Sequence, residues 1–189
     1  MLGETEPQCF CRQARYERDA TTTSMTVARV LIAFCTAASL AAAQAVEFSG
    51  RVVAIADGDT LTILDASNTQ HRIRVDGIDA PEKAQPFGDR SRRSLGELAH
   101  EREAVARCPK IDRFGRHVCK VEVDGLDVGL EQIRRGLAWH FKRYEHEQSD
   151  EDRKRYADSE NDARDAKRGL WSDIRPVPPW TWREMQRGQ

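Results

Sequence analysis

The sequence predicts an α+β domain: a five-stranded OB-fold β-barrel with about three α-helices. Short segments of alternating apolar and polar residues, turn residues between them, and helix-periodic stretches support this prediction. Five short strands with interspersed helices are typical of a small closed barrel. The 189 residues suffice for one domain with a proper core, although periodicity alone does not fix the strand order.

The first three strands are expected between residues 46 and 75. Residues 46–64 alternate on either side of Asp57-Gly58-Asp59, whose Asp-Gly chemistry is typical of a hairpin turn. A third strand is expected over residues 71–75. Its period of two places Ile73 and Val75 on one face and Arg74 on the other.

The second half of the chain is predicted to mix helices and strands. Helical spacing predicts helices over about 89–106, 128–137 and 150–168. Strands over 105–108 and 118–123 flank the turn at 112–116. The tail, 176–183, combines prolines with Trp180 and Trp182 and is expected to pack as an extended strap over the barrel.

The N-terminal sequence predicts export. After Met25, Arg29 precedes an apolar segment at 30–43, and residues 43–45 (Ala-Gln-Ala) fit the small-x-small cleavage pattern. We therefore expect a signal peptide at 25–45 and a periplasmic or extracellular protein, with an uncleaved anchor helix as the alternative. Residues 1–24 are expected to be a mis-assigned start, a disordered extension or a long n-region, leaving 46–189 as the folded domain.

Two of the five cysteines remain after the expected cleavage. Cys108 and Cys119 flank the 112–116 turn and can face each other across a hairpin. An even number of cysteines in an exported protein favours a disulfide, with two buried free thiols as the alternative.

Charge and motif content exclude several classes of protein. The 30 basic and 31 acidic residues nearly cancel, so the chain is not a general polybasic nucleic-acid binder. A polyanion would have to be held by a few well-placed arginines. The five scattered histidines form no zinc motif, and neither a nucleophile elbow nor a phosphate-binding glycine loop is present.

Carboxylates occur in two turn-rich segments, DGDT (57–60) and IDAPE (78–82). Asp59 and Asp79, with a backbone carbonyl and waters, offer the oxygen donors that Ca²⁺ prefers. The alternative is that they are only turn residues, because Asp-Gly is a common turn pair. EF-hand spacing is absent.

Two arginines and a glutamate complete the candidate set. Arg74 and Arg116 can each grip two phosphoryl oxygens and stabilise charge that develops on phosphorus. Glu82 can deprotonate a water for attack on a phosphodiester. For each residue taken alone, a surface role is the alternative.

The motifs together resemble the thermonuclease, or staphylococcal-nuclease-like, family. The resemblance covers nearly all of residues 47–183 and rests on the order and spacing of the following motifs: DGDT (57–60), RVDGIDAPE (74–82), QPFG (85–88), DRFGR (112–116), RRGLAW (134–139), AKRGLW (166–171) and PPWTWR (178–183).

The resemblance implies an OB barrel with three helices and Ca²⁺-dependent cleavage of DNA and RNA, in which the 5′ oxygen leaves. It implies calcium binding by the carboxylates of Asp59 and Asp79 and by the Ala80 carbonyl. The implied phosphate-binding arginines are Arg74 and Arg116, the general base is Glu82, and Tyr144 is a nucleotide contact. Phe114 stands where tyrosine is frequent, which removes a hydroxyl.

The leading hypothesis is therefore an exported nuclease without strong sequence specificity. We expect a monomer without stable membrane association after cleavage. The alternatives are a nucleic-acid- or phosphate-binding module, and a structural calcium-binding protein. Catalysis is favoured because all five of the residues that it needs are present: Asp59, Arg74, Asp79, Glu82 and Arg116.

Overall fold

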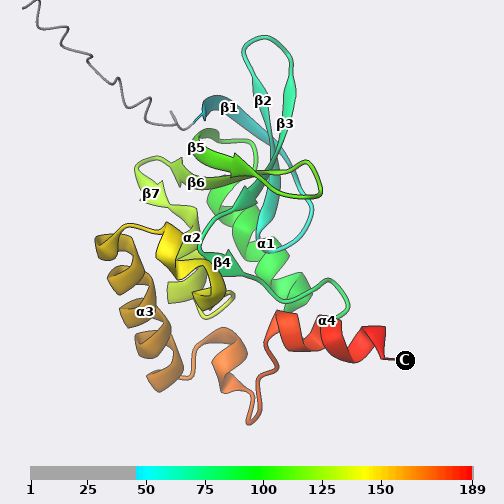
Figure 1. Ribbon diagram of the computed structural model, residues 1–189, viewed down its shortest axis with the longest axis vertical. Helices are drawn as coiled ribbons and strands as arrows, with labels where there is room; N and C mark the ends of the chain where they lie inside the picture. Colours follow the sequence, from blue (N-terminus) through cyan, green and yellow to red (C-terminus); the bar gives the residue numbers. More distant parts are fainter. Residues whose placement is uncertain (1–45, 189) are drawn as a thin grey trace, which may run out of the picture. The chain divides into compact units, whose positions relative to one another are not determined.

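Five strands close into a barrel in the computed structural model, which describes residues 46–188 (Figure 1). The sheet order is β3-β2-β1-β5-β6, and parallel pairing of β3 with β6 closes it. The short β7 extends the sheet beside β6. The expected closed five-stranded barrel is thereby confirmed. The barrel strands are β1 (Val46–Ile55), β2 (Thr60–Asp65), β3 (Gln70–Val75), β5 (Glu103–Ile111) and β6 (His117–Val123), and the extension beside β6 is β7 (Leu126–Asp127).

The barrel core follows from the alternation along each strand. Ile73 and Val75 are buried on one face of β3, and Arg74 lies on the other, as predicted. Helices α1 (Gly88–Ala99) and α2 (Val128–Arg134) add Leu95 and Ile133 to the same cluster. Helix α3 (Asp150–Asp165) adds a buried tyrosine.

A second, smaller cluster of apolar residues lies outside the barrel core. It contains Trp139, Ala163, Leu170 and Trp171, with Trp180 packed against it. Trp139 belongs to β8 (Trp139–His140), which pairs with β4 (Ile78–Asp79). Two 3-10 helices, η1 (Lys142–Glu147) and η2 (Gly169–Ser172), flank α3 in the sequence. This cluster joins the segment that carries Asp79 to the C-terminal part of the chain.

The expected helix over 89–106 is wrong for residues 100–106. Helix α1 ends at Ala99, and β5 begins at Glu103 and pairs with β1. Ala104 and Ala106 are buried on one face of β5, so strand pairing and burial outweigh the helix propensity of the alanines.

The expected extended strap at 176–183 is also wrong. Residues from Pro179 to Arg187 form a helix, α4, which lies at the opposite end of the described domain from the β2–β3 hairpin (Figure 1). Proline fits the first position of a helix, where its missing N–H is not needed. Trp180 anchors this helix beside the rings of Trp139 and Phe141.

Cys108 on β5 and Cys119 on β6 lie at the base of the 112–116 loop. Their sulfur atoms are bonded at 2.03 Å. The bond joins the two strands where their register is interrupted between Arg107 and Lys110. It therefore restrains the loop that carries Arg116.

The expectations for residues 1–24 and 25–45 lie outside the described residues. Within residues 46–188, each helix is too short or too polar to cross a membrane.

Candidate active site

The turn at 57–59 is held rigidly by the helices behind it. The carbonyl of Gly58 accepts a hydrogen bond of 2.8 Å from Nε2 of Gln132, which also donates to the Ser91 carbonyl on α1. A Cβ at residue 58 would lie 1.8 Å from the Ser91 hydroxyl, so the close approach requires glycine. The start of β2 is thereby fixed against α1 and α2.

Asp59 is buried next to this turn and reaches the loop after β4. Its Oδ2 accepts a hydrogen bond of 2.8 Å from the Ala80 backbone N–H, and its Oδ1 accepts one of 3.0 Å from the Thr60 hydroxyl. The two turn-rich segments that the sequence singled out therefore meet at one carboxylate.

Arg74 joins the two buried aspartates. Its Nη1 lies 2.7 Å from Oδ2 of Asp59, and its Nη2 lies 3.0 Å from Oδ1 of Asp79. Burial by itself would lower the pKa of Arg74, but the charges of Asp59 and Asp79 outweigh that effect and raise it. The guanidinium therefore stays charged at the centre of the cluster.

The acidic residues around Arg74 repel one another. Burial raises the pKa of Asp79, despite its ion pairs with Arg183 and Arg74, and the charge of Asp59 adds to the increase. Burial, followed by the charge of Asp59, raises the pKa of Asp57 to about 6. A further positive charge close to Asp59 and Asp79 would relieve the repulsion between these carboxylates.

Glu82 lies at the solvent-exposed side of the site. It follows Pro81 in the loop between β4 and α1, and its backbone N–H donates to Oε1 of Gln85. Its side chain is 41% exposed, whereas that of Asp79 is 1% exposed. Glu82 is therefore the carboxylate of this group with the freer access to water.

Arg116 reaches the site from the loop between β5 and β6. Gly115 has a φ of +75°, which permits the tight turn. Asp112 then holds Arg116 through bonds of 2.7 Å to Nε and Nη2. Nη1 of Arg116 donates to the Thr60 hydroxyl at 3.3 Å, one residue from Asp59. The structure thus brings Arg116 beside the buried cluster.

Arg183 on α4 is a member of the cluster that the sequence reasoning missed. Its Nη2 lies 2.6 Å from Oδ2 of Asp79, and its Nη1 lies 2.6 Å from Oε1 of Glu82. The PPWTWR motif was the available signal, because it places an arginine beside two tryptophans. Because the tail was expected to be extended, the motif gave no reason to place Arg183 at the site.

The comparisons identify the class of protein. The family model described as "Staphylococcal nuclease homologue" matches residues 72–173. The chain belongs to this family. An uncharacterized endonuclease of Haemophilus influenzae is 36% identical over 138 residues, 72% of this chain and 74% of the relative. An uncharacterized endonuclease of Escherichia coli O157:H7 is 38% identical over 74% of this chain and 88% of the relative.

A third relative, the micrococcal nuclease of Shigella flexneri, is 33% identical over 75% of this chain and 83% of the relative. The family and these relatives show that the protein is a nuclease, a hydrolase. Its buried carboxylates and its clustered arginines are the groups that such a hydrolase needs around a phosphodiester.

The donor atoms at this nuclease site fit a hard cation. Asp59, Asp79 and the carbonyl of Ala80 present only oxygen, the donor that a hard cation prefers. Within residues 46–188 no group of three or more His, Cys, Asp or Glu side chains is arranged to hold a metal. Carbonyl and water oxygens would therefore have to complete the coordination.

Tyr144 lies in η1 with a 41% exposed surface. Its ring lies 5.3 Å from that of Phe141 and 4.8 Å from Nζ of Lys110. The hydrogen bonds and ring contacts found for Tyr144 in the described chain do not include the residues of the carboxylate cluster. A role for Tyr144 in nucleotide binding stays a prediction.

Proposed function

We propose that this nuclease is a Ca²⁺-dependent endonuclease that cuts DNA and RNA without strong sequence specificity. The observation that carries the proposal is the bridge from Arg74 to both Asp59 and Asp79, with Arg116 at the neighbouring Thr60. This arrangement joins oxygen donors for a cation to guanidinium groups for a phosphate.

Each residue has a role in the proposed reaction. Asp59, Asp79 and the Ala80 carbonyl would hold Ca²⁺, which supplies Lewis-acid stabilisation of charge on the phosphate oxygens. Arg74 and Arg116 bind the phosphodiester and stabilise its transition state. Glu82 accepts a proton from the attacking water, and the 5′ oxygen leaves.

Phosphate contacts carry little sequence information, so they support cleavage without strong sequence preference. The net charge of −1 supports modest, salt-sensitive binding of the polynucleotide. We also propose that the nuclease is exported and acts in the periplasm or outside the cell as a monomer. The pairing of Cys108 with Cys119 supports an oxidising compartment.

The proposal is tested by cleavage of single-stranded DNA, duplex DNA and RNA during a Ca²⁺ titration. We expect cleavage that EDTA abolishes and added Ca²⁺ restores. Glu82→Gln and Arg116→Ala should lose most activity while keeping the wild-type circular dichroism spectrum. Arg153→Ala is the matched control, because Arg153 pairs with Asp150 on the surface of α3.

Full cleavage in EDTA would refute the calcium requirement. Undiminished cleavage by Glu82→Gln would remove Glu82 from the role of base. Cleavage of DNA but not RNA would narrow the substrate to one class of polynucleotide.

A further inference from the structure

The C-terminal helix contributes a cation to the acidic site. We propose that Arg183 is the resident counter-ion of Asp79 and Glu82, and that a divalent cation binding at Asp79 must displace it. This inference rests on the proposed function, because it takes Asp79 as a cation ligand. The family match ends at residue 173, before α4, so that match assigns no role to Arg183.

Guanidinium groups engage both oxygens of Asp79. Oδ1 accepts from Nη2 of Arg74 at 3.0 Å and from Nη1 of Arg183 at 3.3 Å, and Oδ2 accepts from Nη2 of Arg183 at 2.6 Å. A cation that binds Asp79 in this arrangement would lie against the Arg183 guanidinium. Repulsion between the two positive charges therefore opposes binding until Arg183 withdraws.

Of the two arginines on Asp79, Arg183 is the one that can leave. The Arg74 side chain is 13% exposed and also holds buried Asp59, whereas the Arg183 side chain is 39% exposed and its other partner is exposed Glu82. Arg183 can therefore exchange its bond to Asp79 for water at a lower desolvation cost than Arg74.

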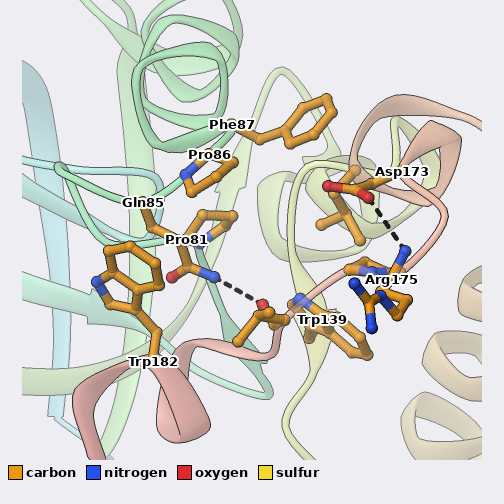
Figure 2. Close-up of a pocket in the computed structure, with 11 residues that line it drawn as sticks. Pro81, Gln85, Pro86, Phe87, Trp139, Asp173, Arg175 and Trp182 are labelled. Carbon is orange, nitrogen blue, oxygen red and sulfur yellow. Dashed lines mark hydrogen bonds between the residues drawn. The ribbon is translucent and has the colours of Figure 1, made fainter. Parts of the chain in front are cut away.

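The contact is specific because α4 is docked at two places. Trp180 packs beside Trp139, whose strand partner is Asp79 itself. Nε2 of Gln85 donates a hydrogen bond of 2.6 Å to the Val177 carbonyl just before α4, and Figure 2 shows this bond from the loop that also carries Pro81. These contacts of α4 therefore hold Arg183 at the site.

The cavity beside these two contacts of α4 is too small to be a substrate-binding site. It lies between Pro81, Gln85, Trp139 and Trp182 (Figure 2) and has a volume of about 50 Å³. That volume suits one or two water molecules rather than a nucleobase. The contacts of Trp180 and Val177 therefore fix the position of α4, and Arg183 is the group that acts on the site.

The test is calorimetric measurement of Ca²⁺ affinity, without substrate, for the wild-type protein, Arg183→Gln and Arg183→Lys. We expect Arg183→Gln to bind Ca²⁺ about tenfold more tightly, because the competing charge is removed. Arg183→Lys, which keeps the charge without the fork, should fall between the two. Arg187→Gln is the matched control, because it removes one charge from α4 at a side chain whose hydrogen bond within residues 46–188 goes to the Arg183 backbone carbonyl.

Arg183 itself gives a second readout. The NMR signal of its side-chain N–H, assigned by its loss in Arg183→Gln, should shift in step with Ca²⁺ binding, and the signal of Arg187 should not. A shifted signal and a tighter-binding variant would support displacement.

Equal or weaker Ca²⁺ affinity in a folded Arg183→Gln variant would overturn the inference while leaving the proposed function standing, provided the wild type still binds. If neither the wild type nor any variant binds Ca²⁺, the inference is overturned, and the cleavage assay with EDTA then decides the calcium requirement of the proposed function separately.

Discussion

The two sides of the candidate site differ in what holds their residues in place. On the buried side, Asp59, Arg74 and Asp79 are fixed by strand pairing and by a shared ion-pair network. On the other side, Glu82, Arg116 and Arg183 project from loops and the C-terminal helix. The Glu82 and Arg183 side chains are 41% and 39% exposed and pair with each other where water can replace the contact, whereas Arg116 is 18% exposed and is held by Asp112 of its own loop.

This difference separates two costs of mutation. Removing a buried charge leaves its partner uncompensated in a low-dielectric environment and destabilises the fold. Removing an exposed charge costs little stability, because water solvates the partner that remains. Loss of activity and loss of stability should therefore coincide on the buried side and separate on the exposed side.

The largest effect is expected for Arg74→Ala. It removes a phosphate ligand and leaves Asp59 and Asp79 facing each other, so cleavage should be abolished. The free energy of unfolding in EDTA should fall by about 3 kcal/mol. Urea unfolding measures this loss, and Arg74→Lys, which keeps the charge, should recover most of the stability and little of the activity. Unchanged stability would show that the buried ion pairs do not hold this side together.

Arg116→Ala should show the contrasting pattern. Loss of one charge-stabilising donor should lower cleavage by about a hundredfold to a thousandfold. The free energy of unfolding should change by less than about 1 kcal/mol, since Asp112 keeps the hydrogen bonds from the backbone N–H groups of Phe114 and residue 116. Single-turnover cleavage and urea unfolding test both halves of this expectation. A loss of stability equal to that of Arg74→Ala would erase the distinction between the two sides.

The same distinction explains what the sequence could predict. The turn chemistry of Asp57-Gly58 placed Asp59 in the turn before β2, and the alternation along β3 placed Arg74 on the face opposite Ile73 and Val75, because local patterns determine both. Strand pairing then sets Thr60 opposite Arg74. Those features of the fold needed no knowledge of distant contacts.

Distant contacts decided the features that were missed. Arg183 meets Asp79 across 104 residues, and the docking of α4 on Trp139 and on Gln85 brings them together. Similarly, Ala104 and Ala106 have helical propensity but complete the barrel by pairing with β1. Local sequence periodicity indicates neither of these contacts, and tertiary packing outweighed local propensity in both places.

The disulfide tests how firmly the exposed loop must be held. Cys108→Ala/Cys119→Ala opens a cross-link between residues 11 apart, which should lower the free energy of unfolding by about 2–3 kcal/mol. Cleavage should fall less than in Arg116→Ala, because Asp112 still orients the arginine. Dithiothreitol should destabilise the wild type and not the variant. Equal stability of the oxidised wild type and the variant would contradict the prediction.

Asp57→Asn should raise stability rather than lower it, and it probes the charge crowding on the buried side. The pKa of Asp57 is raised to about 6, chiefly by burial, from an ordinary value of about 4. Between pH 4 and pH 6 the folded protein keeps a proton on Asp57 that the unfolded chain has lost. The free energy of unfolding of the wild type therefore falls as the pH rises from about 4 to 6. Asparagine escapes that loss and can still accept the Asp59 N–H. In EDTA, the variant should be about 3 kcal/mol more stable than wild type at pH 7 and equal to it near pH 4, as measured by urea unfolding. A difference that does not vary with pH would show that Asp57 titrates normally and that the negative charge is shared only between Asp59 and Asp79.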